Sequence, residues 1–152
     1  MNSILIQKIT EIFLYDNWAN QKLITNINSL SDEEYLRTIS IPFNNVHGLL
    51  QHLYDYQEKY FQKIVNKSLN KITEVVFSRN ILVEKILECS KNWLDWTKKL
   101  DDNSMDIENI FKDIIYLFAH NNYHRGQLQI AVSFLGYQPE SIDIFLYKDL
   151  NQ

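Results

Sequence analysis

Apolar residues recur at three- and four-residue steps along four stretches of the chain, the spacing that places them on one face of an amphipathic helix. Three of these stretches cover about residues 4–27, 45–66 and 78–101. The fourth begins between Asp106 and Ile110 and runs to Leu135. The pattern therefore predicts four long helices joined by modest connections.

Residue types at the ends of these stretches agree with that prediction. Ser31 and Glu34 have the spacing of a capping box, which predicts a short helical turn between the first two long helices. Ser78 is suited to cap the third long helix. Gly136 can adopt the left-handed conformation that ends a helix, and Pro139 follows as a helix breaker.

The tail at residues 141–150 carries apolar residues near helical spacing, namely Ile142, Phe145, Leu146 and Leu150. It is too short to be stable alone, so we expect it to dock on the other helices. The fold class predicted is all-α, a four-helix bundle with a short C-terminal docking helix. With no linker or internal repeat, residues 1–152 are expected to form a single domain.

Composition supports a helical protein and argues against one class of partner. Hydrophobic residues make up 45% and charged residues 22% of the chain, and three glycines and two prolines are too few for a loop-rich β fold. The formal charge of −4 and the lack of a Lys/Arg cluster argue against nucleic acid as a partner.

Cysteine usage and the apolar runs indicate the compartment. Cys89 is the sole cysteine, which excludes an internal disulfide, and its place on the apolar stripe predicts a buried hydrophobe. No secretion signal and no apolar run of roughly twenty residues is found. We expect a soluble, unprocessed, cytoplasmic protein without a membrane partner.

The candidate chemistry lies with the histidines. All four fall in two short windows, and His120 and His124 in the fourth stretch are spaced i,i+4, which puts both imidazoles on one helix face. Two such nitrogens and a third from a neighbouring helix are enough to hold a divalent transition metal. The pair alone is unspecific, because two histidines hydrogen-bonded to core polar groups have the same spacing.

The second stretch offers two candidates for a third ligand. His47 and His52 lie five residues apart, which turns them roughly 140° from one another on a helix, so one could face the pair while the other faces solvent. Spacing alone does not choose between them. Asp55, one turn after His52, could orient that imidazole or be a solvated surface residue.

Other polar residues carry weaker expectations. Arg125 beside a cationic metal would be unfavourable unless it points away, which its place roughly 100° around the helix from His124 allows; binding an anionic substrate carboxylate is the alternative. Glycine inside a helix is costly, so Gly126 suggests close approach of a neighbouring helix or a ligand. Polar residues of the first stretch could reach a cavity but are better explained as its solvent-exposed face; they are Glu11, Asp16, Asn17 and Asn20.

The motifs together resemble those of the DinB-like (DinB/YfiT) metal-binding four-helix bundles. The signature consists of residues 120–127 (HNNYHRGQ) and 136–143 (GYQPESID). Residues 13–20 (FLYDNWAN) are similar to the family's N-terminal tyrosine/tryptophan/asparagine motif, and residues 45–53 (NVHGLLQHL) to its second-helix segment. The resemblance extends over the whole chain.

This resemblance implies a divalent metal, usually zinc or nickel, held by one histidine of the second helix and by the i,i+4 pair. Carried onto this sequence, it implies His52, His120 and His124 as metal ligands, with His47 as the fallback. It also implies a homodimer. Members with a reaction resemble thiol S-transferases or thiol-dependent isomerases.

Two functional hypotheses follow. The first is a metal-dependent enzyme acting on a small molecule, either a transferase that uses a low-molecular-weight thiol or a hydrolase with Asp55 as the nominated base. The second is a non-catalytic bundle whose metal is structural or absent and which acts through dimerisation. Structural zinc sites usually have a fourth protein ligand, and the sequence offers no convincing candidate for one.

Overall fold

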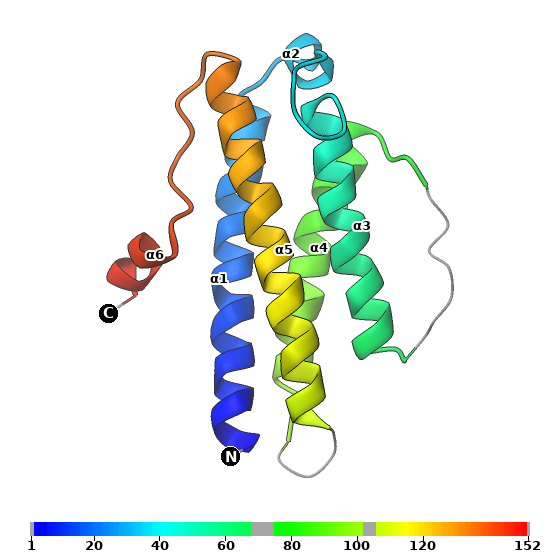
Figure 1. The fold of residues 1–152 in the computed structure, drawn as a ribbon, viewed down its shortest axis with the longest axis vertical. Helices are drawn as coiled ribbons and strands as arrows, with labels where there is room; N and C mark the ends of the chain where they lie inside the picture. The colour runs from blue at the N-terminus through cyan, green and yellow to red at the C-terminus, as the bar shows by residue number, and fades with distance from the viewer. Residues whose placement is uncertain (1, 68–74, 102–105, 152) are drawn as a thin grey trace.

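Four long helices run side by side along the length of the molecule (Figure 1). The structure is a computed structural model that describes residues 2–67, 75–101 and 106–151. The long helices are α1 (Asn2–Asn28), α3 (Val46–Ile64), α4 (Arg79–Thr97) and α5 (Ile107–Phe134), and the short ones are α2 (Asp32–Leu36) and α6 (Ile144–Leu150). These ranges contain no strand, so the predicted all-α bundle is confirmed.

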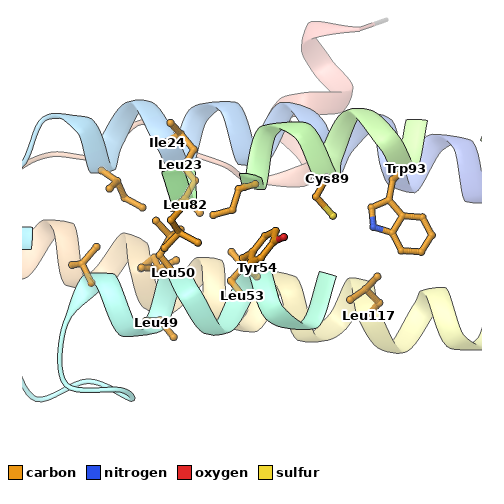
Figure 2. Close-up of a cluster of buried hydrophobic side chains, with 14 of the residues drawn as sticks. Leu23, Ile24, Leu49, Leu50, Leu53, Tyr54, Leu82, Cys89, Trp93 and Leu117 are labelled. Atoms are coloured by element: carbon orange, nitrogen blue, oxygen red, sulfur yellow. The ribbon is translucent and has the colours of Figure 1, made fainter. Parts of the chain in front are cut away.

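Each long helix packs against two others, because α1 contacts α4 and α5 and α3 contacts the same two helices. The Phe13 ring of α1 stacks on Trp93 of α4 with the ring centroids 4.4 Å apart. Tyr54 of α3 lies in the same buried cluster as Leu82 and Cys89 of α4 (Figure 2). Burial of a large apolar side chain stabilises a fold by roughly 1.5–3 kcal/mol, so this core is the main source of stability.

Helix ends follow the predicted signals. Ser31 and Glu34 form both hydrogen bonds of a capping box at the start of α2. The Asn45 side chain caps α3 by accepting from Gly48 N–H at 2.8 Å. Gly136 follows α5 with a φ of +96°. Ser78 does precede α4, but its side chain makes no capping hydrogen bond.

The C-terminal segment turns back after α5 and runs beside α1 to α6, which lies outside the bundle (Figure 1). A helix at the predicted place is confirmed, but none of its residues is buried. Phe145 and Leu150 remain 71% and 64% exposed, so these two of the four apolar residues expected to dock do not carry the contact. Tyr147 carries it instead, with its ring 5.7 Å from Tyr15 and 5.3 Å from Trp18 between centroids. Seven residues are too few to bury a continuous stripe against α1.

Two further expectations concern the burial of Cys89 and the presence of a membrane-spanning helix. Cys89 is buried at 2% exposure, as predicted, and burial raises the pKa of its thiol. Among the described residues, no helix combines the length and the apolar content needed to cross a bilayer.

Candidate metal centre

Three histidines from two helices converge on one side of the bundle. His120 and His124 lie one turn apart on α5, and His52 faces them from α3, which packs directly against α5. One potential ligand atom from each ring lies within 4.8 Å of the others. The ring centroids are 4.4 Å apart for His120 and His124, and 5.3 and 4.7 Å from His52 to those two. We call these three residues the histidine trio.

His47 lies outside the trio. Its Nδ1 shares a 2.8 Å hydrogen bond with the Tyr35 hydroxyl of α2. Burial lowers the pKa of His47, which favours the neutral ring. The spacing in the sequence did not show which of the two α3 histidines faces the α5 pair. In the structure His52 lies beside that pair, and His47 faces α2.

Gln127 orients one ring of the trio. Its Oε1 lies 2.7 Å from His124 Nδ1. A carboxamide oxygen only accepts, so this contact places the proton on Nδ1 and leaves the Nε2 lone pair available to a ligand. This role of Gln127 was not predicted from the sequence, although its i,i+3 spacing from His124 was a visible signal for it.

The state of His120 also fits a metal ligand. Its Nδ1 is buried and has no hydrogen-bond partner among the described residues. A buried polar atom without a partner is costly, and binding a cation is one way to satisfy it. The trio therefore has the atoms and the spacing to hold a metal ion.

The electrostatics favour the neutral ring at two of the three histidines, His120 and His52. Burial, followed by the proximity of His124 and His52, lowers the pKa of His120 to about 4. Burial and the neighbouring His124 also lower the pKa of His52. Neutral imidazole is the form that binds a metal, so the arrangement favours the ligand state near neutral pH.

Three aromatic rings surround the trio. Phe43 stacks on His52 and Tyr56 stacks on His120, each with centroids 4.2 Å apart and an interplanar angle of 26°. Tyr123 meets His124 edge-on at 5.0 Å. None of these three aromatic contacts was predicted from the sequence, and the position of Phe43 depends on loop geometry.

Behind the trio, Arg125 points away from the histidines, as its place on the helix allows, and into the bundle. It is fully buried, and its Nη1 donates to Asp16 Oδ1 of α1 at 2.8 Å. Its Nε donates to Asn20 Oδ1 at 3.0 Å, while Asn121 donates to the other oxygen of Asp16 at 3.1 Å. The expectation that Asp16 and Asn20 lie on a solvent-exposed face was wrong. Arg125 requires buried acceptors, and these two residues supply them from one face of α1.

This polar layer continues to the other two long helices. Asn20 Nδ2 lies 2.7 Å from Ser90 Oγ of α4 and 3.3 Å from Gln57 Oε1 of α3. Hydrogen bonds therefore join all four long helices at the level of the trio. Sliding of one helix past another would break these bonds, so the network restricts the relative register of the helices. Three of its buried atoms, Arg125 Nη2, Asn121 Oδ1 and Gln57 Nε2, have no partner among the described residues.

Asp55 and Gly126, two other residues named in the sequence analysis, lie near the trio in the sequence. Asp55 accepts a 2.8 Å hydrogen bond from Gln51 Nε2. The expectation of a close neighbouring helix at Gly126 was wrong, because a Cβ placed there would meet nothing within 4 Å. Gly126 instead borders a cavity of about 540 Å³ between α5 and the segment at residues 139–144.

Together these features define a helical bundle with a three-histidine centre on one side, formed by facing helices. The family model of the DinB family matches residues 5–152 of the chain. The chain belongs to the DinB family. No curated protein and no solved structure matches it.

Proposed function

We propose that the protein binds a divalent transition metal, zinc or nickel, through His52, His120 and His124 and acts as a metal-dependent enzyme. The convergence of three imidazoles, with one potential ligand atom of each within 4.8 Å of the others, is the observation that carries the proposal. Three protein ligands are typical of catalytic sites, which keep a position open, whereas structural zinc sites use four. Among the described residues, no fourth histidine, cysteine or carboxylate belongs to the group.

The reaction we favour is transfer of a low-molecular-weight thiol to a small electrophile. A divalent metal would supply the Lewis acidity that lowers the pKa of a bound thiol toward neutrality. The chain's own residues hold and orient the site: Gln127 fixes the His124 tautomer, and Phe43 and Tyr56 cover one face each of His52 and His120. These rings limit the approach of water along those faces.

Hydrolysis is the alternative reaction. It requires a general base near the trio, and Asp55, one turn beyond His52, is the carboxylate we nominate. Gln51 Nε2 donates a 2.8 Å hydrogen bond to this carboxylate and would help to hold it in place.

Metal analysis tests the proposal. Wild-type protein purified without chelator should contain about one equivalent of metal, as expected for one three-ligand site. Alanine variants of His52, His120 and His124 should lose it. His47→Ala is the matched control, because it removes a histidine of the same helix that is bonded to Tyr35 instead. Metal-free wild type, or equal metal in all five proteins, would refute the site.

Turnover separates the two reactions. Bacterial thiols should be screened with chloro-aromatic and epoxide electrophiles, and ester or amide substrates without thiol. Thiol-dependent turnover that chelation abolishes supports the transferase. Turnover without thiol that Asp55→Asn removes supports the hydrolase.

A non-catalytic, dimerising bundle is the second candidate function, and exposed apolar residues of α5 favour it. Tyr116, Tyr123 and Ile130 recur at seven-residue intervals and are 68%, 63% and 68% exposed, and Phe134 adds 74%. Seven residues turn a helix by nearly two full turns, so these side chains share one stripe. A stripe of this kind can pair with its copy in a second chain.

We infer from this stripe that the protein is a homodimer. Ile130→Asp should shift the mass measured by light scattering from dimer to monomer. Ile4→Asp on α1, where the apolar side chain is 61% exposed, is the matched control and should leave the dimer intact. A wild-type monomer at all concentrations tested would refute the dimer, and stoichiometric metal without turnover would favour the non-catalytic function.

A further inference from the structure

The loop before α3 places an aromatic residue in an unusual backbone conformation. Asn44 N–H donates to Ile41 C=O at 3.1 Å and closes a turn in which Pro42 is second and Phe43 third. Phe43 has a φ of +63°, and Asn44 follows with +68°. A third turn position with positive φ favours glycine or asparagine, since a side chain there is strained. A phenylalanine at this position is unexpected from turn chemistry alone.

Burial does not explain it either. Phe43 is 47% exposed, so its ring contributes little to the core. The left-handed backbone instead places the Phe43 ring in contact with the trio. The ring lies nearly parallel to His52 at 4.2 Å and meets His124 edge-on at 6.4 Å between centroids.

Gly48 provides the space for this placement. A Cβ built on Gly48 would lie 2.6 Å from the Phe43 carbonyl oxygen and 3.0 Å from its Cβ. Such distances are far below van der Waals contact, so any side chain at position 48 would displace Phe43 or the first turn of α3. Gly48 lies one turn before His52 on the same helix. The strained residue, the glycine and the histidine therefore form one connected unit.

We propose that Phe43 is a positioning residue of the histidine trio: packed against Gly48, it holds the His52 ring in the plane that faces His120 and His124. This inference rests on the proposed metal site. Residues that orient a ligand ring alter metal affinity without touching the metal, commonly by about 10- to 100-fold.

The test uses Co²⁺ as a spectroscopic probe of the full-length protein. Phe43→Ala should weaken Co²⁺ binding by about 10-fold or more and change the visible absorption bands of the bound ion. Phe43→Tyr keeps a ring on His52 and should restore both. Gly48→Ala should reproduce the loss without removing any side chain near the metal. Phe145→Ala, which removes an aromatic residue of α6 exposed to 71%, is the matched control.

A further variant separates positioning from fold stability. Phe43→Gly loses the ring but relieves the positive φ, so its metal-free melting temperature should equal or exceed that of Phe43→Ala. Both variants should nevertheless bind Co²⁺ weakly. A loss of Co²⁺ affinity that simply followed the loss of metal-free stability would overturn the positioning role, as would wild-type affinity in Phe43→Ala.

Failure of the metal site itself gives a different result. If wild-type protein binds no Co²⁺, the proposed function fails, and the ring protons of His52 in the metal-free protein decide the positioning role. Ring currents from Phe43 should shift them upfield in wild type and Phe43→Tyr. The shift should become smaller in Phe43→Ala and Gly48→Ala, although the Tyr56 ring, 4.8 Å from His52 between centroids, still contributes to it. An unchanged spectrum would overturn the inference.

Discussion

The carboxylate of Asp16 on α1 and the guanidinium of Arg125 on α5 form a 2.8 Å ion pair in the interior of the bundle, where both side chains are buried. Arg125 directly follows His124 in the sequence, so one residue of α5 faces α3 and the next faces α1. The orientation of the trio is thus tied to a contact on the opposite side of the helix.

Breaking this pair should be severe. Asp16→Ala or Arg125→Ala leaves a buried charge without its partner, and each should lower the free energy of unfolding by about 3–5 kcal/mol in urea titrations. The double variant Asp16→Leu/Arg125→Met should cost less than the sum of the single variants, since it removes both charges. Lys8→Ala breaks the exposed pair with Glu11 and should cost less than about 1 kcal/mol. Single-variant losses as small as that of Lys8→Ala would contradict a structural role.

Removing the orienting amide should weaken metal binding. Gln127→Ala frees the His124 ring and should lower metal affinity by about 10- to 100-fold in a competition titration. Gln127→Glu keeps an acceptor for Nδ1–H and should retain tight binding. The matched control is Gln129→Ala, two residues along α5, whose side chain donates to Glu140 C=O instead. Equal affinity in Gln127→Ala and Gln129→Ala would show that Gln127 does not orient the ring.

Acid should destabilise the metal-free protein partly through His47. Burial lowers the pKa of His47 in the folded state below the 6.5 of an exposed histidine. Below pH 6.5 the unfolded chain therefore binds a proton that the folded chain resists, so stability is full above that pH and falls as the pH drops toward the folded-state pKa. In chelator, His47→Gln should show a shallower loss of stability than wild type over this range. Identical pH profiles would exclude a contribution from His47.

The C-terminal segment should be released by one substitution in α1. Asn26 donates to Glu140 C=O at 3.1 Å and accepts from Glu140 N–H at 2.9 Å. Asn26→Ala leaves both backbone groups without this partner and should cost about 1–3 kcal/mol. Hydrogen exchange in the segment after Gly136 should accelerate. Lys22→Ala breaks only the exposed ion pair with Glu140 and should leave exchange nearly unchanged.

The helices were predictable because their signals are local. The expected fourth helix, ending at Leu135, agrees with α5 at Ile107–Phe134 to within a residue at its C-terminus. The capping box and Gly136 depend only on neighbouring residues, so sequence was enough to find them. Docking of α6 was less predictable. The path of the segment at residues 137–143 determines which side chains of α6 face α1.

The site was only partly predictable, because it depends on how helices meet. The i,i+4 pair on α5 is visible in the sequence, but His47 and His52 differ only in direction, which the packing of α3 on α5 determines. Asp16 and Asn20 looked solvent-exposed because their partner Arg125 lies more than a hundred residues away. The contact of Phe43 with His52 was not predicted, because it requires a positive φ that no sequence pattern indicated.

The location of Cys89 bears on where a reactive sulfur could come from. It is the only cysteine in the sequence, and it lies on α4 at 2% exposure with a thiol that is hard to ionise. α4 packs on α1 and α3, on the far side of the core from the face that α5 presents to His52. Cys89 is therefore a poor source of nucleophilic sulfur, and oxidants should not inactivate the protein through this thiol. A sulfur-transfer activity at the histidine trio would depend on the supply of reduced thiol in the surroundings, which would couple its rate to their redox state.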